Sequence, residues 1–97
     1  MARNQKLTGV IQGRTLLSAK PDRLLLSLGF SDGSIMTIRL GAPAPSVITG
    51  GTVRCVRQRD RTIDFDFMDG SSLELNMAEA TSCVMLRDRS GVLEYAD

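Results

Sequence analysis

The sequence predicts an all-β domain built from a duplicated three-strand antiparallel meander, with an added N-terminal strand and a C-terminal hairpin. The first observation is an Asp-Gly-Ser turn at Asp32–Ser34 that recurs 37 positions later at Asp69–Ser71. The second is apolar alternation with a period of two on both sides of each turn, which is typical of strands with one buried face. The third is the arrival of turn signals about every 8–12 residues, as a meander requires.

The N-terminal segment is expected to add one strand, centred on Val10 and Ile11. These two residues lie between Gly9 and Gly13, which are typical of strand ends or bulges. The only helical turn that we expect lies near Ala78–Thr81, and it is too short to change the fold class.

The two copies of the meander cover about residues 13–48 and 50–86 of a single domain, residues 1–97. Six apolar positions coincide at the 37-residue offset. In the first copy they are Leu26, Leu28, Phe30, Met36, Ile38 and Leu40, and in the second they are Ile63, Phe65, Phe67, Leu73, Leu75 and Met77. Upstream of these positions, Leu16 matches Val53 at the same offset. We nevertheless expect the first loops of the two copies to differ in length by about a residue.

The Asp-Gly-Ser turns determine the register of the strands that they join. Apolar residues on both sides face the same way only if the loop has three residues, Ser31–Gly33 in the first copy. This loop places Leu28 opposite Met36, and its counterpart places Phe65 opposite Leu73. Such a loop is a type I turn closed by a residue with positive φ, the role of its glycine.

The remaining segments connect and extend the two copies. Residues 41–45, Gly-Ala-Pro-Ala-Pro, predict a stiff extended connector. The last residues predict a hairpin with Val84 opposite Tyr95 and Leu86 opposite Leu93. Seven or eight short strands in this length suit a small sandwich, a roll or a partly open barrel.

Composition excludes some classes of function. The 97 residues include 12 Lys and Arg against 11 Asp and Glu, which leaves a net charge of +1 and indicates no bulk attraction to nucleic acid or anionic lipid. The lack of histidine removes the commonest metal ligand and the usual general base. No signal peptide or membrane-spanning run is apparent, so we expect a cytoplasmic protein with no membrane association. Cys55 and Cys83 each have apolar neighbours and are expected to be buried, reduced thiols.

Apolar residues on the outer face of the first copy predict an interaction surface, formed by Leu16, Leu25 and Ile35. Such side chains need a cover, which the N-terminal strand, the C-terminal hairpin or another subunit would supply. A small core also benefits from a symmetric homodimer. The leading prediction is therefore a non-enzymatic interaction or assembly module, homodimeric, with a protein partner. It has no catalytic residue, metal or cofactor, in line with the missing nucleophile and phosphate-binding motifs.

An arginine-rich segment supports an alternative prediction, a small-barrel protein that binds single-stranded RNA or DNA. The arginine side chain binds phosphate groups well. Four arginines lie in or next to an expected five-residue loop over residues 57–61. They are Arg54, Arg57, Arg59 and Arg61. The phenylalanines have inward parity, however, which leaves only Tyr95 to stack on a base.

Three carboxylates on the outer face of the second copy support a third prediction, a carboxylate-based hydrolase or cation site. The expected loop places Arg54 opposite Asp64, and the Asp-Gly-Ser turn places Glu74 opposite Asp64 on the other side. Asp66 lies one pleat away. Paired carboxylates serve acid–base catalysis and bind hard cations.

Overall fold

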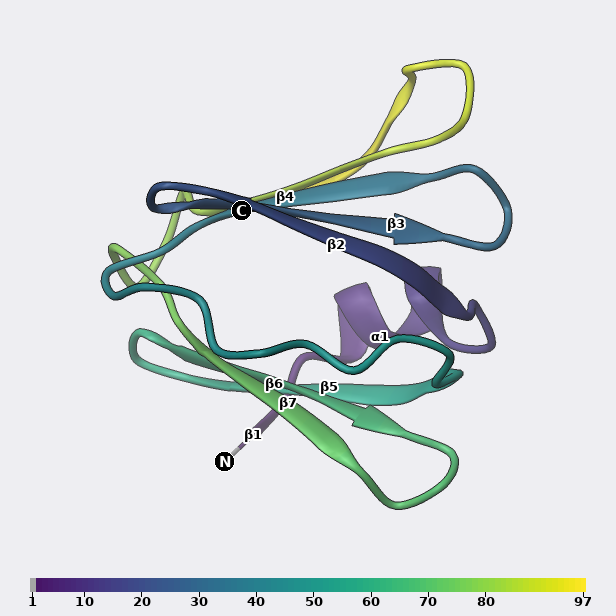
Figure 1. Cartoon of the computed structure of the whole chain (residues 1–97), viewed down its shortest axis with the longest axis horizontal. Helices are drawn as coiled ribbons and strands as arrows, with labels where there is room; N and C mark the ends of the chain where they lie inside the picture. Colours follow the sequence, from purple (N-terminus) through teal and green to yellow (C-terminus); the bar gives the residue numbers. More distant parts are fainter. Residues whose placement is uncertain (1) are drawn as a thin grey trace.

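The computed structural model describes residues 2–97, and it consists of two antiparallel sheets packed face to face (Figure 1). Its elements, in chain order, are β1 (Ala2–Arg3), α1 (Gln5–Ile11), β2 (Leu16–Asp22), β3 (Leu25–Phe30), β4 (Ile35–Arg39), β5 (Val53–Arg59), β6 (Thr62–Phe67), β7 (Ser72–Asn76), β8 (Val84–Arg87) and β9 (Leu93–Ala96). One sheet has the strand order β1-β5-β6-β7 and the other the order β2-β3-β4-β8-β9. The all-β prediction is confirmed, and the architecture is a sandwich.

The duplicated meander is present as predicted. β2, β3 and β4 form the first copy, and β5, β6 and β7 each begin and end 37 positions after their counterparts. Two isolated bridges join the sheets, and each links equivalent positions, Thr15 with Thr52 and Leu40 with Met77. Contacts between equivalent positions are characteristic of a two-fold axis. The two copies are therefore related by an approximate two-fold axis within one chain.

The first loops of the two copies have the same length, so the predicted difference of about one residue is wrong. Each is a two-residue turn whose first residue has positive φ, 56° at Arg23 and 52° at Asp60. A β-bulge near the start of β2, matched by a bulge in β5, changes the register instead. The bulge preserves inward parity without a longer loop.

The Asp-Gly-Ser turns have the predicted geometry. Leu28 lies opposite Met36, and Phe65 lies opposite Leu73. In both copies the aspartate carboxylate accepts hydrogen bonds from the backbone N–H and the hydroxyl of the serine two residues later. The local chemistry of the turn therefore determines the register of the hairpin.

Replacing the turn glycines should separate backbone strain from side-chain crowding. Gly33 and Gly70 have φ of 87° and 89°, but a Cβ would meet nothing within 4 Å at Gly70, whereas at Gly33 it would lie 2.8 Å from the Cβ of Arg89. We expect Gly70→Ala to lower the free energy of unfolding by about 1 kcal/mol and Gly33→Ala to lower it further. Urea denaturation measures both losses, and equal losses would contradict the role of Arg89.

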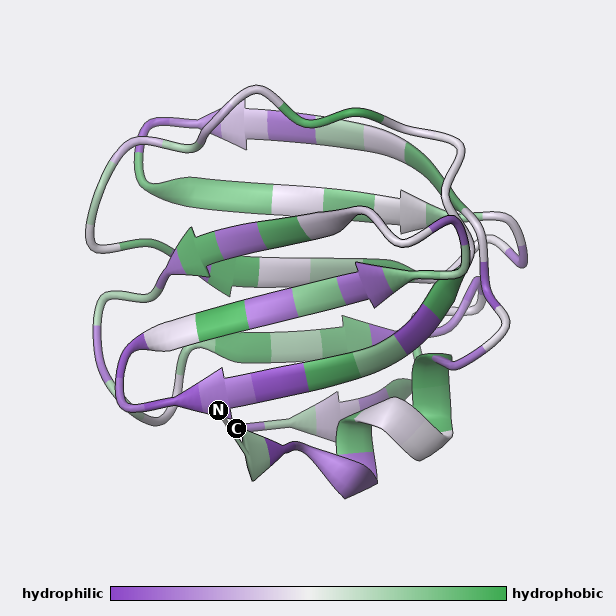
Figure 2. Cartoon of the chain, turned by 90° about the horizontal axis from the view of Figure 1, so that it is seen from below, coloured by the Kyte–Doolittle hydropathy of each residue, from purple (hydrophilic) through white to green (hydrophobic). Residues whose placement is uncertain are grey.

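The core lies between the sheets and contains the inward-facing side chains of both copies. Two segments close the open sides of the sandwich. α1 contacts β5 and β9 on one side, and the connector (residues 41–50) closes the opposite side, where Ala44 and Val47 pack against the core. Figure 2 shows α1 and the connector along opposite edges of the molecule.

Residues 5–11 form a helix, so the prediction of a strand through Val10 and Ile11 is wrong. Leu7 and Ile11 lie one helical turn apart and are both fully buried. The side chain of Asn4 caps the helix by accepting a hydrogen bond of 3.0 Å from the N–H of Leu7. The turn expected near Ala78–Thr81 is not helical. No helix in residues 2–97 has the length and apolar character needed to cross a membrane.

The C-terminal hairpin has a different register from the predicted one. Tyr95 lies opposite Leu86 rather than Val84, and Leu93 lies opposite Arg87. The reason is a compact loop in which the carboxylate of Asp88 accepts hydrogen bonds from the backbone N–H groups of Ser90 and Val92. The loop is followed by a bulge in β9, where Glu94 is the extra residue. Both cysteines are buried and unpaired, as predicted.

Candidate functional site

The outer face of the five-stranded sheet is the candidate interaction surface. Leu25 and Ile35 project from it with 41% and 52% of their surface exposed. Leu16, which was expected beside them, is only 1% exposed and belongs to the core, so its assignment to this surface is wrong. Its backbone pairs with Phe30 before the bulge of β2, and both side chains point inward.

Two further apolar side chains belong to this surface, and the sequence alone did not identify them. Met85 and Leu93 are 40% and 47% exposed. Met85 lies opposite Thr37, and Leu93 lies opposite Arg87, whose other partner is Ile35. Side chains directly opposite each other share a face of the sheet. We name this surface the apolar face, and its members are Leu25, Ile35, Met85 and Leu93.

The apolar face is hollowed on either side of Thr37 and Met85. Both residues line two separate hollows, one of about 500 Å³ next to Leu25 and Arg39, the other next to Ile35. Protruding and hollow regions therefore alternate across the face. Such relief can accept the side chains of a partner.

The outer face of the four-stranded sheet carries a buried ion-pair network centred on Asp66. Arg57 donates to both carboxylate oxygens, from Nε at 2.6 Å and from Nη2 at 3.0 Å. The hydroxyl of Ser72 donates at 2.7 Å and the thiol of Cys55 at 3.2 Å. These donors, Arg57 foremost, hold the pKa of Asp66 well below its usual value although the side chain is only 6% exposed. Asp66 is thus a fully bonded carboxylate, which makes it a poor general base.

Asp64 lies directly opposite Glu74, as predicted. Its hydrogen bonds differ from those of Asp66. Its Oδ2 accepts a hydrogen bond of 3.1 Å from Arg57, while its buried Oδ1 has no hydrogen-bond partner among residues 2–97. Burial, and then the charge of Glu74, raise the pKa of Asp64. The expectation that Arg54 lies opposite Asp64 is wrong, because the two-residue turn at Asp60 and Arg61 places Arg57 there, and Arg54 is the extra residue of the bulge in β5.

The two outer faces differ at equivalent positions of the repeat. Asp66 corresponds to Gly29, and Ser72 corresponds to Ile35. A Cβ on Gly29 would collide with the hydroxyl of Ser18, so the first copy has no room for a counterpart of Asp66. One face is consequently covered by its own polar network, and the other is left apolar.

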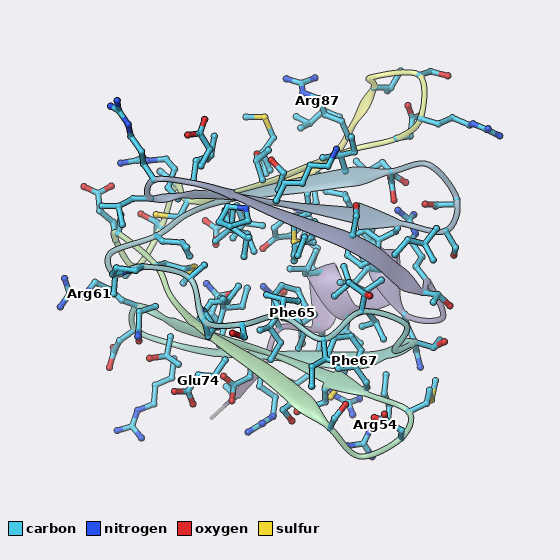
Figure 3. All side chains as sticks on the ribbon, in the orientation of Figure 1. Arg54, Arg61, Phe65, Phe67, Glu74 and Arg87 are labelled. Atoms are coloured by element: carbon cyan, nitrogen blue, oxygen red, sulfur yellow. The ribbon has the colours of Figure 1, made fainter. Side chains whose placement is uncertain are left out.

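The four arginines of the alternative prediction do not gather into one patch. Arg57 is engaged by Asp64 and Asp66. Arg54 and Arg61 lie at opposite ends of the molecule, as Figure 3 shows, and Arg59 is exposed at the end of β5. A nucleic-acid site needs cations that follow one backbone path, and this distribution does not favour it.

Comparison with known proteins adds no family. No protein-family model matches the chain, and no curated protein or solved structure gives a significant match. Within residues 2–97, no group of three or more Cys, Asp or Glu side chains is placed to hold a metal ion. The two outer faces are therefore the basis for assigning a function.

Proposed function

We propose that this protein is a non-enzymatic β-sandwich interaction module that forms a homodimer through its apolar face. The observation that supports it is the exposure of Leu25 and Ile35 on a sheet face that the chain itself leaves bare. Two segments of the chain could have covered these residues, and neither does. The N-terminal segment forms α1 and packs into the core, and the C-terminal hairpin pairs with β4 and extends the sheet. Another subunit is the remaining cover.

The size of the apolar face suits a modest interface with a second copy. Five strands at about 4.8 Å spacing and about 17 Å long give a footprint of about 400 Å². Specific interfaces bury about 800 Å² per partner, so contacts from the rim, including Arg39 and Arg87, must contribute. We expect a dimer that dissociates at micromolar concentration. A cytoplasmic location is part of the same proposal, and the two free thiols support it.

Introducing a charge on the apolar face should separate the subunits. We expect Ile35→Glu to remain folded, because the side chain is half exposed, and to shift the dissociation constant of the dimer by at least about 30-fold, since a charge would be buried in the interface. Sedimentation velocity across a concentration series measures the shift.

Ile48→Glu is the matched control, because Ile48 is 87% exposed on the connector, away from the apolar face. This variant should keep the dimerisation of the original chain. A chain that is monomeric at all concentrations would contradict the proposal, as would dissociation by Ile48→Glu with no effect of Ile35→Glu.

A further inference from the structure

β7 forms one edge of the four-stranded sheet. Its odd-numbered residues bond to β6, as shown by Phe67 N–H donating to Ser71 and Met77 N–H donating to Arg61. In an antiparallel pair the intervening residues direct their N–H and C=O groups to the other side. The backbone groups of Ser72 and Glu74 therefore face the open edge, where no strand pairs with them among residues 2–97.

The first copy of the meander shows how a further strand pairs at the equivalent edge. The strand equivalent to β7 is β4, and its corresponding edge is paired with β8 from Ile35↔Arg87 to Ile38↔Val84. The 37-residue offset relates β8 to residues 47–50 of the connector. These residues would pair with β7 if the two-fold symmetry were complete, but they form no strand. Part of the connector instead lines a hollow with Ala19 and Pro21 of β2. The two-fold repeat thus leaves one strand position empty.

The charge beside this edge is negative and incompletely neutralised. Across the sheet, Arg57, Asp64 and Glu74 lie in one row, with Glu74 exposed at the margin. The guanidinium of Arg57 is shared between Asp64 and Asp66, and the buried Oδ1 of Asp64 has no partner. A cation opposite Glu74 would offset the excess negative charge of the adjacent Asp64 and Glu74 at this end of the row.

We propose that the edge of β7 binds an extended basic peptide by antiparallel strand addition, with a Lys or Arg opposite Glu74 and apolar residues on either side of it. The flanking residues would lie over Leu73 and Leu75, as Leu86 and Val84 lie over the equivalent residues of β4. Strand addition supplies affinity through the backbone and specificity through alternate side chains. Self-pairing of two β7 strands is disfavoured, because it brings Glu74 close to its own copy.

A short synthetic peptide tests this docking mode. Binding of a fluorescent, end-capped Val-Lys-Val-Lys-Val peptide is measured by anisotropy with the full chain. We expect Glu74→Lys to weaken binding at least about tenfold through like-charge repulsion. Glu79→Lys, at an exposed acidic residue just beyond the strand, is the matched control and should bind the peptide like the original chain. A Val-Glu-Val-Glu-Val peptide should not bind.

Backbone methylation distinguishes strand addition from simple charge attraction. The lysine N–H groups of the docked peptide point to Glu74 and its neighbours, and the valine N–H groups point away. N-methylation of the lysines should therefore abolish binding, whereas N-methylation of the valines should not. Failure of the lysine peptide to bind, equal binding of both methylated peptides, or full binding by Glu74→Lys would each overturn the proposal. The Ile35→Glu chain should bind the peptide normally, so this outcome is independent of the dimer.

Discussion

Replacing Phe65 by alanine is expected to lower the free energy of unfolding by about 3–5 kcal/mol. The ring is only 1% exposed at the centre of the sandwich, between Val56 on β5 and Leu73 on β7 in the register of the sheet. Truncation removes its buried apolar surface and leaves a cavity that the surrounding strands cannot fully close. Since a domain of this size has about 5–15 kcal/mol of stability in total, the variant should be close to unfolding.

Urea denaturation followed by circular dichroism measures the loss, and two variants serve as comparisons. Leu28 occupies the position equivalent to Phe65 in the first copy and is equally buried, so Leu28→Ala should cost about 2–5 kcal/mol. Met68 is 56% exposed, and Met68→Ala should change stability by less than about 0.5 kcal/mol. A loss below 1 kcal/mol at Phe65 would show that the inward parity of β6 is not what the structure describes.

That inward parity is the part of the fold that could be predicted from sequence. The pairs Leu28–Met36 and Phe65–Leu73 follow from local turn chemistry and a period of two, both of which are present in short stretches of sequence. The 37-residue offset adds a second, independent observation, because each copy supports the register of the other.

The register beyond the Asp-Gly-Ser hairpins could not be predicted, because bulges have no clear sequence signature here. Without a bulge, inward parity of Val53 required a longer loop and placed Arg54 opposite Asp64, whereas the bulge at Arg54 keeps Val53 inward with a shorter turn. The expected five-residue loop is therefore a two-residue turn at Asp60 and Arg61, and this three-residue difference places Arg57 opposite Asp64. The ion-pair network on this face was therefore outside the reach of parity arguments.

The helix and the full apolar face were missed for two different reasons. Leu7, Val10 and Ile11 have helical spacing, and Asn4 is a favourable cap, but Gly9 and the β-branched residues favoured a strand. The apolar face depends on strand order: β8 joins β4, far away in sequence, and only this pairing brings the C-terminal hairpin onto the same face. The hydrophobic pattern within a strand does not indicate which distant strand it pairs with.

Replacing Asp66 by alanine is expected to lower the free energy of unfolding by about 2–3 kcal/mol. The substitution removes the acceptor of Arg57, Ser72 and Cys55 at once. The value lies below that of a fully buried ion pair, because about a third of the Arg57 side chain is exposed and keeps contact with water. The comparison is Asp64→Asn, which retains an acceptor for Arg57 and removes the repulsion with Glu74, so it should leave stability unchanged or raise it slightly at neutral pH.

The two aspartates should also give opposite pH dependences. The pKa of Asp66 is lower in the folded protein than in the unfolded chain, so its contribution to stability is complete above its usual pKa of about 3.9 and is lost as the pH falls below that value. The pKa of Asp64 is raised, so its charged form opposes folding, and acidification through the raised pKa relieves this cost before Asp66 is affected. Chemical denaturation between about pH 2 and 7 should therefore show a smaller acid loss in Asp66→Asn than in the original chain. Asp64→Asn should retain the full acid loss, and if both substitutions gave the same pH profile, the network centred on Asp66 would not be the source of acid sensitivity.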